Sequence, residues 1–155
     1  MKTLSTTAAL LLLASLASIA SAADVGQIKT SKGTVLIVRD GKELPVAAGT
    51  GVQQADRVVT KGDGSAGITF ADNSMLSLGP DSMLDISRFS FNAKNQPDTL
   101  EATLHRGTLS AVSGKIVAKS PEAMRIRTPT TILGVRGTEF YVQVVNPDTA
   151  ATAAK

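Results

Sequence analysis

Short runs of alternating apolar and polar residues, separated by turn residues, extend through most of this chain. Leu100, Ala102 and Leu104 alternate with polar residues, as do Ile68 and Phe70. Successive side chains of a strand point to opposite faces, so this alternation predicts strands with one buried face. After residue 22, no stretch of ten or more residues carries the 3.6-residue apolar period of a helix. The sequence therefore predicts an all-β fold, either a twisted two-layer β sandwich or a solenoid-like stack of short, mostly antiparallel strands.

Glycine-containing turns predict two hairpins near the N-terminal end of the domain. Asp40-Gly41 is a strong hairpin signal, because both residues tolerate the positive φ that a tight turn requires. Ser31-Lys-Gly33 predicts another hairpin, between strands over 26–30 and 34–39. We expect each of these turns to join two strands that pair with each other.

The segment after Ser113-Gly114 carries one helical signal within extended structure. Lys115-Ile-Val-Ala118 is expected to be extended. Ser120-Pro-Glu-Ala123 could form one helical turn, with serine as the N-cap and proline at the first helical position.

Two five-residue segments of the chain echo each other. Ser74-Met-Leu-Ser-Leu78 and Ser82-Met-Leu-Asp-Ile86 match at an offset of eight residues. Two units are too few to form a solenoid on their own. The echo indicates either adjacent, similarly built strands or a local coincidence. In the first interpretation the inner face is shared by Leu76, Leu78, Leu84 and Ile86.

The N-terminal residues 1–22 have the pattern of a secretory signal peptide. Lys2 supplies the positive charge, and Ala20-Ser21-Ala22 is a small-residue cleavage site. An uncleaved membrane anchor is the alternative, but the apolar run has only about 13 residues where a spanning helix needs about 20. No cysteine follows the site, and no later apolar stretch is long enough to span a bilayer. We expect a domain over 23–145, a flexible tail over 146–155, and export to the periplasm or beyond.

Composition excludes several classes of function. The chain has 16 Lys and Arg against 13 Asp and Glu, a small excess rather than a basic patch for nucleic acid. Four Phe, one Tyr and no Trp argue against a sugar-stacking platform or a single-stranded nucleic-acid surface. The chain has no cysteine, so an exported domain must be held by its core alone.

Residues suited to catalysis or metal binding are scarce. His105 is the only histidine, and its alternating context predicts an ordinary surface strand residue. The sequence has no Cys and His cluster for zinc, no nucleophile elbow and no phosphate loop. Asp72, Asp81 and Asp85 do not have the spacing of a calcium loop and are expected to cap turns. We therefore predict a protein that is not an enzyme and has no metal or cofactor.

The stretch from Met124 to Val145 is the most distinctive of the sequence, and we expect the fold to be organised around it. Met124 and Ile126 fall on one face of a strand, with Arg125 and Arg127 on the other. These two arginines are candidates for partner contact, and a solvated face is the alternative. The side chains predicted to be buried in the core are those of Leu76, Leu84, Ile126 and Phe140.

Two glycines later in this stretch predict an unusual backbone. Gly134 and Gly137 bracket Arg136, and we expect at least one of them at positive φ or against a closely crossing strand. Arg136 is predicted to be partly buried and forked onto a carboxylate or carbonyl groups. Contact of Arg136 with a partner is the alternative.

The motif Thr128-Pro129, followed by Val135-Arg136-Gly137-Thr138-Glu139-Phe140, resembles the closing motif of the FecR domain family. Segments upstream are similar to that family's usual order, so the resemblance spans residues 25–145. The similar segments are Gly41–Leu44, Gly51–Thr60 and Ala66–Leu76.

The chain departs from the family's pattern at two turns. Ala55-Asp56 stands where Gly-Asp is usual, and Asp72-Asn73-Ser74 where Asp-Gly-Ser is usual. Asparagine tolerates the left-handed backbone better than most residues, so the second departure is mild.

The resemblance implies a regulatory role in the envelope of a Gram-negative bacterium. Family members typically receive a signal from an outer-membrane iron-siderophore receptor and pass it through a membrane helix to a cytoplasmic sigma-factor regulator. This sequence shows no cytoplasmic domain, spanning helix or obvious receptor-docking domain, so we expect only the periplasmic β domain to carry over. The resemblance thus implies a non-enzymatic regulatory or protein-interaction module with an envelope protein as partner, linked to iron transport or cell-surface signalling. The alternative is a secreted or surface β module that binds glycan or matrix.

Overall fold

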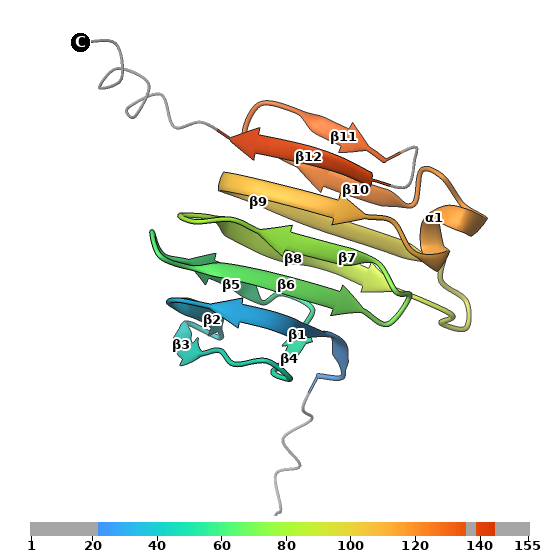
Figure 1. Cartoon of the computed structure of the whole chain (residues 1–155). Helices are drawn as coiled ribbons and strands as arrows, with labels where there is room; N and C mark the ends of the chain where they lie inside the picture. Colours follow the sequence, from blue (N-terminus) through green and yellow to red (C-terminus); the bar gives the residue numbers. More distant parts are fainter. Residues whose placement is uncertain (1–21, 136–138, 145–155) are drawn as a thin grey trace, which may run out of the picture.

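The computed structural model describes residues 22–135 and 139–144. Nearly all of the predicted signal peptide, and the whole predicted tail, lie outside these residues. Strands dominate the described part of the chain, as the all-β prediction requires (Figure 1). The elements are β1 (Asp24–Lys32), β2 (Val35–Arg39), β3 (Lys42–Pro45), β4 (Gly51–Gln53), β5 (Arg57–Thr60), β6 (Ser65–Phe70), β7 (Met75–Leu78), β8 (Met83–Ser90), β9 (Thr99–Val112), α1 (Lys115–Lys119), β10 (Met124–Arg127), β11 (Ile132–Gly134) and β12 (Glu139–Val144).

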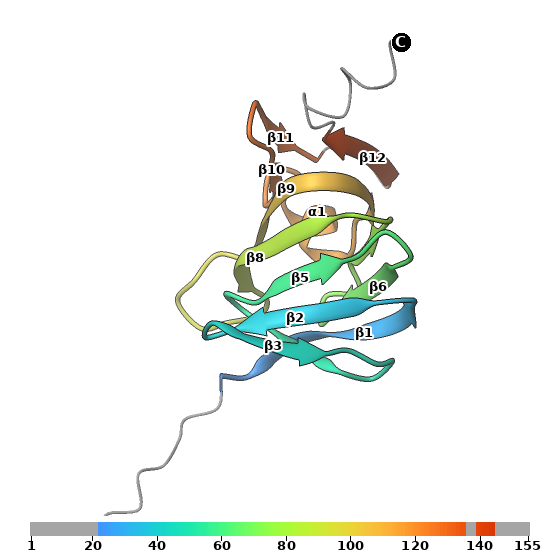
Figure 2. The ribbon, with the colours of Figure 1, turned by 90° about the vertical axis from the view of Figure 1, so that its left-hand side faces the viewer.

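The strands curl into two facing sheets that share β9. Sheet A has the order β4-β1-β6-β7-β9-β12, and sheet B has the order β3-β2-β5-β8-β9-β10-β11. The chain crosses repeatedly from one sheet to the other while it advances along the stack, as the colour gradient in Figures 1 and 2 shows. Strand pairing is antiparallel except between β9 and β10. The fold thus combines two-layer packing with the solenoid-like advance that the sequence predicted.

The strand that organises the fold is β9, and not the predicted stretch after Met124. Residues before Gly107 pair with β8 and β10 in sheet B, and Gly107 and the residues after it pair with β7 and β12 in sheet A. At Gly107 the backbone has a φ of +86° without ending the strand. The bend lets one strand bind four neighbours, whereas β10 and β12 each lie beside it near the end of the stack.

The apolar core lies between the two sheets. Leu84 and Ile126 are fully buried, as predicted, and so are the predicted inward residues Leu76 and Ile86. Phe140 packs against the core but is only partly buried, so the prediction that it is buried is wrong. It lies on β12 at the end of sheet A, where no further described strand covers it.

One of the two predicted hairpins is confirmed. Asp40 and Gly41 have φ of 51° and 76° and join the paired strands β2 and β3. The second prediction is wrong in its pairing, because β1 pairs with β4 and β6 while β2 pairs with β3 and β5. The turn at Gly33 carries the chain from sheet A to sheet B, so the strands it joins lie in different layers.

The segment after Gly114 is helical where an extended segment was expected. α1 buries Ile116 and Val117 against the core, and Ser120 ends it by donating its N–H to the Ile116 carbonyl at 2.9 Å. The segment from Ser120 to Ala123 is a turn, in which the Ala123 N–H donates to the Ser120 carbonyl at 3.0 Å. The short helix therefore lies five residues before the predicted one.

The echoed segments are similarly built strands that are not adjacent. β7 and β8 both pair with β9, one on each side of Gly107. Each begins after a buried serine: Ser74 Oγ accepts a hydrogen bond from Gly114 N at 3.0 Å, and Ser82 Oγ accepts one from Thr108 N at 2.9 Å. The echo therefore reflects two equivalent places in the stack.

Candidate functional site

Arg125 and Arg127 lie on the exposed side of β10, as the alternation predicted. Both approach Glu101 on the neighbouring β9: Arg125 Nη1 lies 3.7 Å from Oε1, and Arg127 Nη2 lies 3.8 Å from Oε2. Ion pairs this long and this exposed contribute little to stability. The geometry therefore describes a solvated, charged face that leaves both guanidinium groups accessible.

Gly134 does not have the unusual backbone predicted for at least one of the two glycines, so that prediction now rests on Gly137. The φ of Gly134 is not in the left-handed region, and a Cβ built there has no neighbour within 4 Å. Gly134 ends an exposed strand at the edge of sheet B, where neither strain nor close crossing applies. Arg136 and Gly137 lie outside the described residues, so their predicted roles stay predictions.

Asp56, from the resemblance motif, is a buried structural carboxylate. Its side chain is 1% exposed and receives a two-pronged hydrogen bond from Arg39, with both N–O distances at 2.7 Å. Its Oδ2 also accepts the N–H of Gln53 at 2.7 Å. Because a buried charge needs such partners, Asp56 joins the β4–β5 turn to β2. The preceding Ala55 has a φ of 72°, a left-handed conformation that glycine adopts at less cost than alanine.

Asp72, from the second motif, holds the turn between β6 and β7. It is fully buried and accepts hydrogen bonds from Ser74 N at 3.0 Å and Ser74 Oγ at 2.6 Å. Its Oδ2 also accepts the N–H of Ile116 at 3.3 Å, which ties the turn to α1. The predicted turn-capping role of Asp72 is confirmed, and Asn73 adopts the predicted left-handed backbone with a φ of 68°.

An ion-pair cluster that sequence reasoning missed crosses sheet B. Asp85 on β8 accepts two hydrogen bonds from Arg57 on β5, at 2.5 and 2.8 Å, and its Oδ2 lies 2.8 Å from His105 Nε2 on β9. The hydrogen bonds from Arg57 lower the pKa of Asp85, against the opposing effect of desolvation, and the contact with His105 lowers that pKa further. The predicted surface histidine is thus on the surface but paired. Its partner Asp85 lies 20 positions away in sequence, and Arg57, the other partner of Asp85, lies 48 positions away, so only strand register brings the three together.

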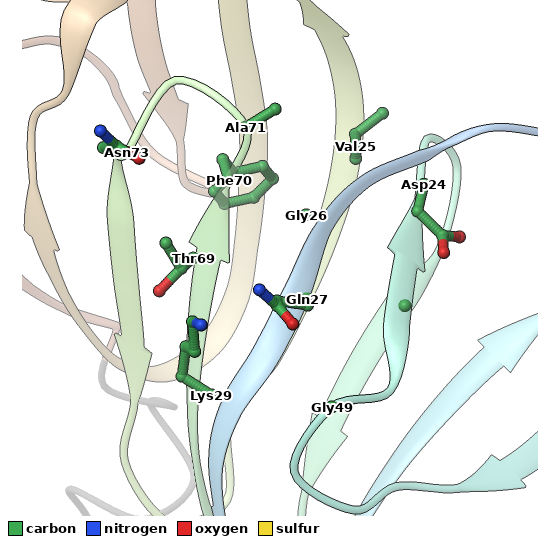
Figure 3. A pocket seen from close by; sticks show the side chains of 11 residues that line it. Asp24, Val25, Gly26, Gln27, Lys29, Gly49, Thr69, Phe70, Ala71 and Asn73 are labelled. Atoms are coloured by element: carbon green, nitrogen blue, oxygen red, sulfur yellow. The ribbon is translucent and has the colours of Figure 1, made fainter.

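A shallow hollow of about 560 Å³ lies where β1 crosses between β4 and the β6–β7 turn (Figure 3). Figure 3 shows Asp24 on one side of β1, with Thr69 and Lys29 on the other. The Asp24 carboxylate already accepts a hydrogen bond from Gln53 Nε2 at 3.1 Å. The residues that line the hollow provide hydrogen-bonding groups but include no histidine or cysteine that could pair as base and nucleophile.

The outer face of sheet A is uncharged across its central strands, β6, β7 and β9. Gly67, Ser77 and Ser110 lie opposite one another in a continuous cross-strand row, with Thr30 at one end and Tyr141 at the other. This row and its neighbours on β6, β7 and β9 form what we call the small-residue face, made of Ser65, Gly67, Thr69, Met75, Ser77, Thr108, Ser110 and Val112. Met75 and Tyr141 stand out from this side of the sheet, with 45% and 64% of their surface exposed. The outward side of these strands thus presents small, uncharged residues beside two exposed large side chains.

Two further properties of the described residues bear on function. Within residues 22–135 and 139–144, no group of three His, Cys, Asp or Glu side chains is arranged to hold a metal ion. In the same part of the chain, no helix has the length and apolar character needed to cross a membrane.

Comparison with protein families identifies the family of this chain. The family described as FecR protein matches residues 56–154. The match begins at Asp56, so the predicted resemblance of Gly41–Leu44 lies outside it, and it continues into the segment predicted as a tail. Neither the curated proteins nor the solved structures contain a match to this chain. Because the match covers more than half of the chain, and includes both buried carboxylates, Asp56 and Asp72, this protein belongs to the FecR family.

Proposed function

We propose that this protein is a non-enzymatic regulatory and protein-interaction module of the bacterial envelope, exported to the periplasm, that binds an envelope protein in a pathway linked to iron transport or cell-surface signalling. Family membership carries the proposal, since FecR proteins are regulatory and act in signalling with other proteins. The export signal predicted over residues 1–22 supports the compartment.

The small-residue face supports the choice of surface. Its outward residues carry no charge, whereas the outer side of sheet B carries the Arg57–Asp85–His105 cluster and the Glu101 pairs. Desolvating an uncharged face costs less than desolvating charged groups that end up imperfectly paired. We therefore assign partner binding to sheet A, with Met75 at one end of the middle strand of this face, β7.

In-cell photo-crosslinking tests this assignment. A photoreactive residue in place of Met75 on β7 should capture one envelope protein reproducibly, identified by mass spectrometry. The matched control replaces Leu44 on β3, which is similarly exposed at 39% but lies in sheet B, and should capture only background. Identical products from both positions would contradict the assignment of the small-residue face.

A second crosslinking experiment tests the link to iron transport. Capture through Met75 should differ between iron-starved and iron-replete cells if the module serves iron transport, and equal capture would contradict that link.

A glycan array tests the alternative function, which is glycan or matrix binding. Of the described aromatic residues only Tyr141 is largely exposed, which is little for a sugar-stacking surface. Saturable glycan binding without protein capture would replace the proposed function.

A further inference from the structure

The two ends of the strand stack differ in how their edges are protected. At the N-terminal end, β3 carries Lys42, Glu43 and Pro45, and β4 has only three residues. Charges, proline and shortness are the usual means by which an edge strand avoids pairing with another chain. At the C-terminal end, β11 also has three residues, but β12 has six, with neither lysine nor proline. Among the described edges, β12 alone is long and unprotected.

The outer edge of β12 pairs with no other strand of the described chain. One edge binds β9 along its whole length, from Glu139 opposite Val112 to Val144 opposite Gly107. Figure 2 shows β12 at the end of sheet A, apart from β11 at the end of sheet B. The inward residues Phe140 and Val142 are half-buried, and Tyr141, on the outward side, is 64% exposed. A further strand beside β12 would cover the inward pair and give Tyr141 a neighbour.

We propose that β12 pairs antiparallel with β12 of a second copy of this chain, about a two-fold axis at Tyr141, so that sheet A continues through both copies. This inference does not depend on the proposed function, because it needs no other protein. A two-fold contact uses the same surface on each copy and closes at a dimer.

The alternation of β12 sets the register of this pairing. Residues opposite each other in an antiparallel pair lie on the same face, so outward residues must face outward residues. Pairing Tyr141 with the second copy's Tyr141 meets this condition and sets Phe140 opposite Val142. Glu139 then lies opposite Gln143, which can donate a hydrogen bond to it. The strand is therefore complementary to itself: an aromatic pair lies at the centre, apolar pairs lie inside, and no like charges meet.

A charge-exchange experiment on the purified protein tests the pairing. The wild type should sediment as a dimer, measured by analytical ultracentrifugation over a concentration series. Tyr141→Lys and Tyr141→Glu each place two like charges on the axis and should weaken dimerisation more than about tenfold. An equimolar mixture of the two variants should restore the dimer, because unlike charges then face each other. Tyr141 is mostly exposed, so both variants should keep the wild-type circular dichroism spectrum.

Single cysteines test the register, since the chain has none of its own. Tyr141→Cys places two thiols opposite each other and should give a disulfide-linked dimer on mild oxidation. Gln143→Cys is the matched control on the same strand and face. Its two thiols would lie four residues apart along the strand, roughly 13 Å, which is too far for a disulfide.

Several outcomes would overturn the proposal. One is a wild type that stays monomeric at every concentration, in which case another protein or residues 145–155 cover the edge. Another is a mixture of the lysine and glutamate variants that remains monomeric. Equal crosslinking of the Tyr141→Cys and Gln143→Cys proteins would exclude the register.

Discussion

The Ser82 hydroxyl accepts a hydrogen bond from the backbone N–H of Thr108, at a distance of 2.9 Å, where β9 bends. Ser82 is fully buried and precedes β8 in sheet B, while Thr108 lies in the half of β9 that belongs to sheet A. Gly107, immediately before Thr108, has a φ of +86°, and a Cβ built there would lie 2.5 Å from the Ser82 Cα. The closeness of Ser82 to the bend therefore connects the two sheets and demands glycine at position 107.

Gly107→Ala should destabilise the protein strongly. The substitution combines strained positive φ with a clash against Ser82, and strain of this kind alone costs about 1–3 kcal/mol. Urea unfolding measures the loss. Gly134→Ala is the control, since a Cβ there meets nothing within 4 Å, and it should change stability by less than about 0.5 kcal/mol. Equal losses in the two variants would contradict the role given to the bend.

Ala55→Gly should stabilise the protein. Ala55 has a φ of 72°, and an L-residue in the left-handed region costs about 1–2 kcal/mol. Glycine also gains freedom in the unfolded chain, which offsets about 0.4–1 kcal/mol. We expect a net gain of about 0.5 kcal/mol in urea unfolding. Ala48→Gly, in an exposed turn and not among the described residues with positive φ, should give no gain.

Leu84→Ala should cost about 2–5 kcal/mol, as is usual when a fully buried leucine is truncated. Phe140→Ala should cost less, because Phe140 is only partly buried at the end of sheet A. Thermal melts at one low protein concentration compare the two. Leu44→Ala, at a site that is 39% exposed, should be nearly neutral. A larger loss at Phe140 than at Leu84 would show that the core extends further past β9 than the described strands indicate.

Asp85→Asn should lower stability at pH 7 by an amount that shrinks in acid. Arg57 holds the pKa of Asp85 below its ordinary 3.8 in the folded protein. A lowered pKa stabilises the fold above the unfolded value, and the contribution is lost as pH falls through the folded value. The difference in free energy of unfolding between wild type and Asp85→Asn should therefore have its full size above about pH 5. It should become smaller as the pH falls below 3.8.

Urea unfolding at several pH values, at constant ionic strength, measures this difference. Arg57→Gln removes the main cause of the lowered pKa and is the matched variant. In a protein that already carries Arg57→Gln, Asp85→Asn should lower the free energy of unfolding by less than it does in the wild type. A difference that stays constant from pH 7 to pH 3 would rule out the assigned pair.

Processing at Ala22 should yield a mature protein that begins at Ala23, recovered from the periplasmic or secreted fraction. The short apolar run and the small residues at 20–22 direct cleavage there. Intact-mass measurement identifies the new N-terminus. Ala20→Arg together with Ala22→Arg should block processing and leave the precursor with the inner membrane. A wild-type protein that retains Met1 would refute the prediction.

The amino-acid sequence by itself determined most of the strands and which side of each of these is buried. The alternation of Leu100, Ala102 and Leu104 placed all three in the core. The tolerance of Asp40-Gly41 for positive φ set the turn between β2 and β3. These features depend on neighbours a few residues away, so a local pattern is sufficient to predict them.

Only the tertiary structure decided which strands pair and which charged groups meet. The turn at Gly33 carries the chain from one sheet to the other, so the strands on either side of it do not pair. Lys115–Lys119 is helical because Ile116 and Val117 pack against the core and the Asp72 carboxylate accepts a hydrogen bond from Ile116 N in the first turn. These tertiary contacts outweigh the weak local preference of the segment for an extended conformation. Arg57, Asp85 and His105 meet only because β5, β8 and β9 are neighbours in sheet B. Such contacts join residues distant in sequence, and the free energy that selects them comes from burial across the whole stack rather than from any one segment.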